Sequence, residues 1–164
     1  MPCGITTCAI WHFVLELERG SRKSDGVKTK KPKPHVYPDI QDNIAMARRV
    51  EEGLPVVDVV HFGKQAGFTN EELARLIQVP PRTYARRVAS KARLKVHESE
   101  RAARLMRVFD RAKQLFVTDE NTQGWFHASI PALGGKTPLE YAQTEPGARE
   151  VENVIGRIEH GIVM

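Results

Sequence analysis

Hydrophobic residues recur every three or four positions along much of this chain, which is the spacing of one face of an α-helix. Ile44, Ala47 and Val50 form such a face within residues 39–53. Pro55 suits the start of a second helix, which we expect to end near Gly67 because glycine favours helix C-termini. The pattern predicts an all-α protein.

A short helix, a tight turn and a second helix are predicted to follow. Thr69 to Glu72 has the spacing of a capping box, and Val79-Pro80-Pro81 indicates a turn. The order is that of a helix-turn-helix. The segment resembles the bacterial helix-turn-helix pattern at Leu73, Ala74, Val79, Thr83, Tyr84, Arg86 and Val88. It departs from that pattern at Pro80, where Ser or Asn is usual, and in having no glycine in the turn.

A long helix is predicted next, capped by Ser99 and reaching Phe116. Its apolar stripe includes Leu105, Phe109 and Ala112, which indicates either a core or a dimer seam. Trp125 and Phe126, beyond this helix, have the same two readings: core of a small domain, or anchor for a partner.

The stretch from residue 125 to residue 161 carries the strongest local signals. Gly134-Gly135 indicates a turn, and Thr137 with Glu140 forms a second capping box. Thr144 is a further candidate cap. An amphipathic helix is predicted after Gly147, with its buried stripe at Val151, Val154, Ile155 and Ile158 and its end at Gly161.

This stretch resembles the toxin-binding domain of Xre/MbcA/ParS-type antitoxins. The matching residues are Pro131, Leu133, Gly134, Thr137, Pro138, Leu139, Thr144, Gly147, Val151, Ile155, Ile158 and Gly161. The resemblance implies a type II antitoxin that blocks a RES-domain toxin, a class that depletes or uses NAD, and that often represses its own operon. It also implies that the C-terminal end lies at the mouth of the toxin's NAD pocket. The predicted toxin-binding residues lie off the buried stripe or at this end: Glu150, Arg157, Glu159, His160, Gly161, Ile162, Val163 and Met164.

Charge and composition divide the 164 residues into three parts. We expect a flexible tail at 1–38, where Lys, Ser, Gly and Pro dominate, a helix-turn-helix domain at 39–97 and a toxin-binding domain at 98–164. Residues 82–113 hold 11 basic and 3 acidic side chains, a net charge of +8, and residues 114–164 hold 3 and 7, a net charge of −4. Two surfaces with different partners follow from this asymmetry. The predicted DNA-binding residues are Arg82, Thr83, Arg86, Arg87 and Lys91.

Other function classes find less support in the sequence. No apolar run reaches the length of a membrane helix, and Cys3 and Cys8 form neither a disulfide framework nor a zinc site. We therefore expect a cytoplasmic homodimer that needs no metal or cofactor and is not an enzyme. The alternative function is a stand-alone dimeric helix-turn-helix regulator without a toxin partner. A small enzyme is a third and weaker alternative, since distant residues can converge in a fold.

Overall fold

The computed structural model describes residues 43–161, and within them the chain forms eight α-helices and one short 3₁₀ helix. The sequence predicts this all-α class. The tail predicted at 1–38 lies outside the described residues. In chain order the elements are α2 (Asn43–Glu52), α3 (Val56–Ala66), α4 (Asn70–Leu76), α5 (Pro81–Ser90), α6 (Val96–Phe116), α7 (Asp119–His127), η1 (Pro131–Leu133), α8 (Pro138–Tyr141) and α9 (Glu145–Glu159).

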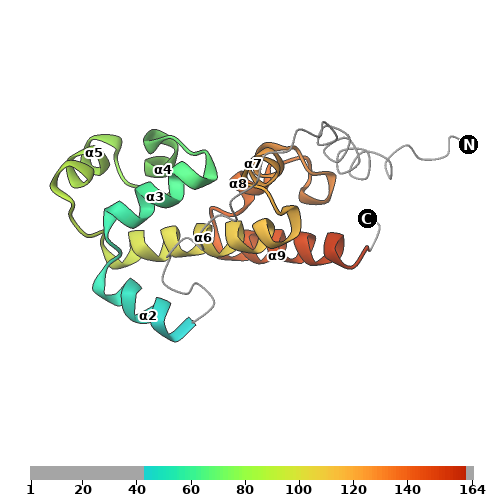
Figure 1. Ribbon diagram of the computed structural model, residues 1–164, viewed down its shortest axis with the longest axis horizontal. Helices are drawn as coiled ribbons and strands as arrows, with labels where there is room; N and C mark the ends of the chain where they lie inside the picture. Colours follow the sequence, from blue (N-terminus) through green and yellow to red (C-terminus); the bar gives the residue numbers. More distant parts are fainter. Residues whose placement is uncertain (1–42, 162–164) are drawn as a thin grey trace, which may run out of the picture.

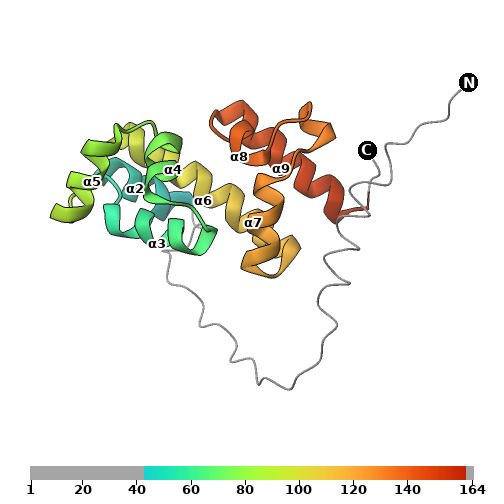
Figure 2. The same ribbon diagram turned by 90° about the horizontal axis from the view of Figure 1, so that it is seen from above.

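Helix α6 is the axis on which the other elements are assembled (Figure 1). It packs against α2, α3, α7 and α9, and both views show α9 running beside its second half (Figure 2). Leu105, Phe109 and Ala112 of its apolar stripe are only 3%, 3% and 0% exposed within one chain. The stripe is therefore core, and it cannot also be the seam of a dimer.

Aromatic side chains join the two halves of the chain into one core. The ring of Phe109 lies 5.6 Å from that of Phe62 on α3 and 5.4 Å from that of Phe126 on α7. Trp125 continues the cluster with its ring 5.3 Å from that of Phe116. Trp125 and Phe126 are 2% and 1% exposed, so the structure places both in the core and not on a partner-facing surface.

The start of α6 differs from the prediction. The helix begins at Val96, and Ser99 is fully buried in its first turn and does not cap it. The Ser99 hydroxyl instead accepts a hydrogen bond of 2.8 Å from the backbone N–H of Leu54. Glu98 takes the capping role, because its carboxylate accepts from the N–H of Lys95 at 2.8 Å.

The expected domain division at 97/98 falls inside the first turn of α6. Because α6 packs on elements from both sides of this point, the described residues share one hydrophobic core. The division into residues 39–97 and 98–164 therefore remains a proposal about segments of the sequence, not about separate hydrophobic cores.

Candidate functional site

The turn between α4 and α5 is closed without glycine. Gln78 takes the left-handed conformation, with φ of 56°, at the place where helix-turn-helix sequences often carry glycine. Ile77 and Val79 on either side of it are 0% and 3% exposed. Their burial holds the turn, so a conformation that is strained for a long side chain persists. Thr69 begins α4 with the predicted capping box, in which Glu72 completes the pair of hydrogen bonds.

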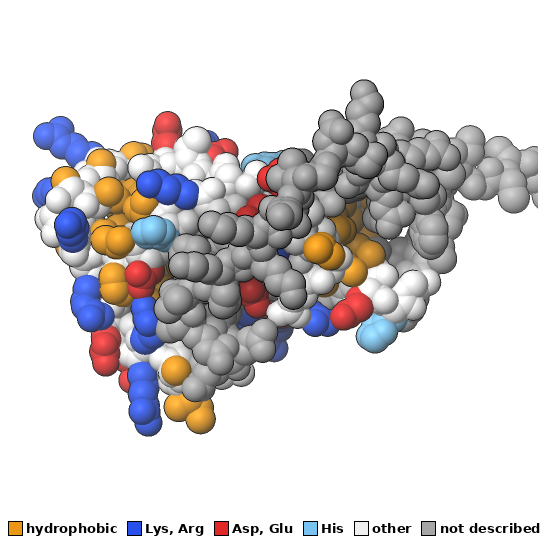
Figure 3. Space-filling model, in the orientation of Figure 1, with side chains coloured by type: hydrophobic (Ala, Val, Ile, Leu, Met, Phe, Trp, Pro, Cys, Tyr) orange, Lys and Arg blue, Asp and Glu red, His pale blue; other side chains and the backbone are white. Residues whose placement is uncertain are grey.

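Helix α5 has one face in the core and one face outside. Tyr84 is its one fully buried residue, at 1% exposed. Arg82, Arg86 and Lys91 are exposed, and Thr83 is half-buried. Lys and Arg side chains gather on the end of the molecule that carries α5 (Figure 3). Among the described residues, Arg82, Arg86 and Lys91 have no ion-pair partner, which leaves their charge available to an anionic ligand.

Arg87 is not part of this exposed face, contrary to the prediction. Its guanidinium forms an ion pair with Glu98 at the start of α6, and the two side chains are only 14% and 7% exposed. Burial alone would raise the pKa of Glu98, but the hydrogen bonds from the Lys95 N–H and from Arg87 hold it below its ordinary value. Glu98 therefore stays ionised, and Arg87 connects α5 to α6.

Much of the +8 charge of residues 82–113 also faces inward. The arginines of α6 bond to carboxylates of α9 in a row: Arg104 to Glu145 at 2.9 Å, Arg107 to Glu145 at 3.1 Å and to Glu152 at 2.8 Å, and Arg111 to Glu159 at 2.5 Å. We call this row the arginine ladder. In this row, arginine charge that the sequence suggests for DNA binding and glutamate charge that it suggests for toxin binding neutralise each other. The net charges of the two segments thus overstate the fields at their surfaces.

The loop that precedes α8 has the conformation that its motif predicts. Gly134 and Gly135 have φ of 66° and 79°, which glycine adopts without strain. The Ser129 hydroxyl donates to the carbonyl of Gly135 at 2.6 Å and closes the loop. Thr137 then begins α8 with a capping box to Glu140. In this motif, the two glycines shape the loop, and Thr137 with Glu140 caps α8.

Helix α9 is an amphipathic helix that covers α6. Thr144 caps it as predicted, and Val151, Val154 and Ile155 of its stripe are 0%, 0% and 1% exposed. Ile158 is half-buried against the same core. The apolar stripe and the arginine ladder lie on adjacent faces of α9 and both hold it on α6, which sets the orientation of its remaining face.

The predicted toxin-binding residues of α9 are less free than the sequence indicates. Glu150 and Arg157 form an ion pair with each other, and Glu159 belongs to the arginine ladder. His160 and Gly161 are exposed where the helix ends. Ile162, Val163 and Met164 lie outside the described residues. The exposed face of α9 also includes Arg149 and Asn153, which the sequence reading missed.

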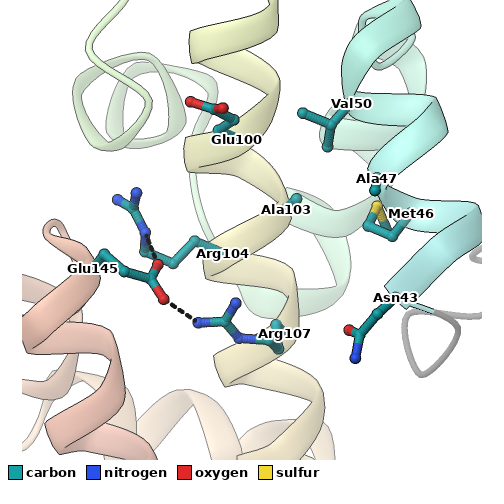
Figure 4. A pocket seen from close by; sticks show the side chains of 9 residues that line it. All are labelled: Asn43, Met46, Ala47, Val50, Glu100, Ala103, Arg104, Arg107 and Glu145. Atoms are coloured by element: carbon teal, nitrogen blue, oxygen red, sulfur yellow. Dashed lines mark hydrogen bonds and ion pairs between the residues drawn. The ribbon is translucent and has the colours of Figure 1, made fainter.

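A groove of about 450 Å³ runs between α2, α6 and the start of α9 (Figure 4). One wall is apolar, with Met46 and Val50 of α2, and the other is formed by Arg104 and Arg107. Both arginines point to Glu145, so the charges within the groove are already paired. This groove lies where the two halves of the chain meet. Its lining offers no unpaired cation to an anionic ligand.

Two family matches divide the chain at α6. Residues 45–107 match the antitoxin Xre-like helix-turn-helix domain. Residues 111–161 match the antitoxin Xre/MbcA/ParS C-terminal toxin-binding domain. The residues that build the α4–α5 site belong to the first match, and α7 to α9 belong to the second.

Whole-chain comparison gives the same result. The protein "Antitoxin Xre" of Photorhabdus laumondii subsp. laumondii is 40% identical over 115 residues, which cover 70% of this chain and 78% of that protein. "Antitoxin Xre" of Yersinia enterocolitica is 37% identical over 122 residues, covering 74% and 78%. A more distant relative, the "Prs ADP-ribosylating antitoxin" of Sphingobium sp., is 22% identical over 160 residues, covering 89% and 97%.

The chain belongs to the Xre antitoxin family of type II toxin–antitoxin systems, with an Xre-like helix-turn-helix followed by a toxin-binding domain. The family has a toxin as its partner and neutralises by binding, which agrees with the expectation that the chain is not an enzyme. Within residues 43–161, no helix is long and apolar enough to cross a membrane.

Proposed function

We propose that this antitoxin neutralises a RES-type, NAD-degrading toxin by blocking access to its active site, and that it represses its own operon through α5. The observation that carries the toxin half of the proposal is the match of residues 111–161 to the toxin-binding domain, which includes the whole of α9. The resemblance to antitoxins of RES-domain toxins supplies the chemical class of the partner.

The mounting of α9 supports a steric mechanism. A blocking element must not swing away when substrate competes, and α9 is held by a buried apolar stripe and by the arginine ladder. Its end at His160 and Gly161 is exposed and is followed by three further residues. We infer that these last residues enter the pocket, while the exposed face of α9 with Arg149 and Asn153 contacts the rim.

Truncation after His160 tests this mechanism. The shortened protein should fold and still co-purify with the toxin, because the α9 face remains, but NAD consumption and growth arrest should return when toxin and antitoxin are co-expressed. If the truncated protein still protects NAD, the terminal residues are not the plug and the helix face alone blocks the site. A protein that no longer co-purifies would place the main contacts in the tail.

Operon repression is supported by the exposed face of α5. Arg82 and Arg86 lie four residues apart on a helix of a helix-turn-helix, where arginines can bond guanine bidentately. Arg86→Ala should weaken binding to DNA from the antitoxin's own promoter by a factor that corresponds to about 1–3 kcal/mol. Arg149→Ala is the matched control, because it removes the same charge from α9, away from α5. Equal affinities of the two variants would contradict base contact by Arg86.

A two-fold dimer remains part of the proposal, since palindromic operators require two recognition helices. The dimer must use a surface other than the buried stripe of α6. A strict monomer in sedimentation at tens of micromolar would contradict it. The alternative of a regulator without a toxin partner loses its support, because the chain belongs to an antitoxin family.

A further inference from the structure

Glu98 is an unusual residue for its position. It is a carboxylate only 5% exposed, at the start of the helix that forms the centre of the fold. Buried charges are retained in proteins when they are paired and hydrogen-bonded, and Glu98 has both kinds of partner, in Arg87 and in the backbone of Lys95. The residues around Glu98 form a hydrogen-bonded frame. Ser99 accepts from the Leu54 N–H at 2.8 Å, and the Leu94 N–H donates to the Leu54 carbonyl, also at 2.8 Å.

Through its ion pair with Glu98, Arg87 connects α5 to this frame. Successive residues of a helix lie about 100° apart around the axis, so Arg86 and Arg87 cannot share a face. Arg86 is exposed, whereas Arg87 reaches back to Glu98. The buried Tyr84 and the packing of α5 against α3 and α4 hold the helix on the core. The charge-assisted bond between Arg87 and Glu98 adds a directional contact on one side of the helix, so it restrains the rotation of α5.

Rotation of α5 matters because base recognition depends on direction. Groups that bind a ligand need to be held within about 0.5 Å and 10–20° of the productive geometry. Contacts with phosphates are more tolerant, because they are largely electrostatic and carry no sequence information.

We propose that Arg87 and Glu98 are positioning residues for DNA recognition: the pair sets the rotation of α5 so that Arg82 and Arg86 meet base edges, and Arg87 does not contact DNA. This inference rests on the proposed DNA binding. It gives an acidic residue a role in sequence specificity, although its negative charge by itself would repel DNA.

Glu98→Gln distinguishes positioning from simple electrostatics, because the two predict opposite changes in affinity for promoter DNA. The substitution removes a negative charge, so electrostatics alone predicts tighter binding. Loss of positioning predicts binding to promoter DNA that is weaker by about tenfold, within the range for one misplaced base contact. Affinity for DNA of unrelated sequence should not fall. Gln can still accept from the Lys95 N–H, so the start of α6 is kept, but its neutral amide lacks the charge that strengthens the bond from Arg87 to the same oxygen. Glu100→Gln is the matched control, because Glu100 is exposed on the same helix, and its affinity should equal or slightly exceed that of the unchanged protein.

Two further measurements keep the outcome decisive. Arg87→Gln should lose promoter binding as Glu98→Gln does, whereas Arg87→Lys, which keeps a cation to pair with Glu98, should retain more of it. Thermal melts should confirm that every variant is folded at the assay temperature. If Glu98→Gln binds the promoter as tightly as Glu100→Gln does, the positioning role is wrong while DNA binding stands. If the unchanged protein binds no promoter DNA, the proposed function of α5 fails, and the positioning role fails with it.

Discussion

Gly147 lies against the carbonyl of Tyr141, and a Cβ atom at this glycine would be 1.9 Å from the carbonyl oxygen. The contact forms the corner at which the chain leaves α8 and enters α9, so the backbone there approaches more closely than any other residue allows. Gly156, three residues before the end of α9, is different: a Cβ atom there would meet nothing within 4 Å.

We expect Gly147→Ala to destabilise the protein, because overpacking against backbone costs about 1–3 kcal/mol or more. Gly156→Ala is the matched change in the same helix, and it should stabilise by about 0.5–1 kcal/mol because alanine favours a helix. Denaturant unfolding of both variants measures the difference. Equal stabilities would contradict the close contact at Tyr141. If Gly156→Ala also binds the toxin less well, the open side of this glycine faces the partner.

The arginine ladder should make stability depend on pH and salt. Burial alone would raise the pKa of Glu145, but hydrogen bonds from Arg104 and Arg107 lower it overall. A carboxylate whose pKa is lowered by folding stabilises the fold above its unfolded pKa, and this contribution is lost as the pH falls through the folded pKa. The melting temperature should therefore fall as the pH drops below about 4.5, the ordinary range for glutamate.

Arg107→Ala removes the ladder's central residue, which bonds two carboxylates that are 40% and 28% exposed. Because the pairs are partly in solvent, we expect a loss of only about 1 kcal/mol, together with a weaker dependence of stability on salt. A double-mutant cycle with Glu152→Gln isolates the pair. A coupling energy of zero would show that the Arg107–Glu152 pair does not help to hold α9 on α6.

Tyr84 offers a test of the core beneath α5. Its hydroxyl is buried without a hydrogen-bond partner among the described residues, and burial raises its pKa to about 12. Tyr84→Phe should be neutral or stabilising, because an unsatisfied polar group buried in the core costs about 1–3 kcal/mol. A clear loss of stability in denaturant unfolding would mean that the hydroxyl has a partner in solution.

If α5 binds DNA as proposed, its exposed face also predicts which bases it contacts. Ala85 and Ala89 are exposed beside Arg82 and Arg86, and alanine contacts the methyl group of thymine, as arginine bonds guanine. DNA selected from a random library should hence contain thymine next to guanine. Replacing each such thymine by uracil removes only the methyl group and should weaken binding severalfold. Unchanged affinity with uracil would mean that the alanines do not contact the thymine methyl groups and that the arginines alone contact bases.

The elements of this fold follow from local signals, whereas the pairings between them do not. The caps at Thr69, Thr137 and Thr144 lie within three residues of their partners, so their hydrogen bonds could be predicted from spacing. The apolar stripe of α9 likewise follows from helical periodicity.

The errors all concern contacts that depend on tertiary geometry. Arg87 has the same charge as Arg86, and only the position of Glu98, eleven residues later, removes it from the exposed face of α5. Arg111 and Glu159 are 48 residues apart, so no local pattern links them. Ser99 has the residue type of a cap, but the approach of Leu54 makes it a buried acceptor.

The cellular NAD level tests the central claim most directly. The proposed partner, a RES-type toxin, is expressed alone, with the full-length antitoxin, and with the antitoxin truncated after His160. We predict that NAD falls with the toxin alone and with the shortened antitoxin, and that it stays at the level of toxin-free cells with the full-length antitoxin. A toxin that arrests growth while NAD remains constant would contradict the account, since the blocked activity would then be another chemistry.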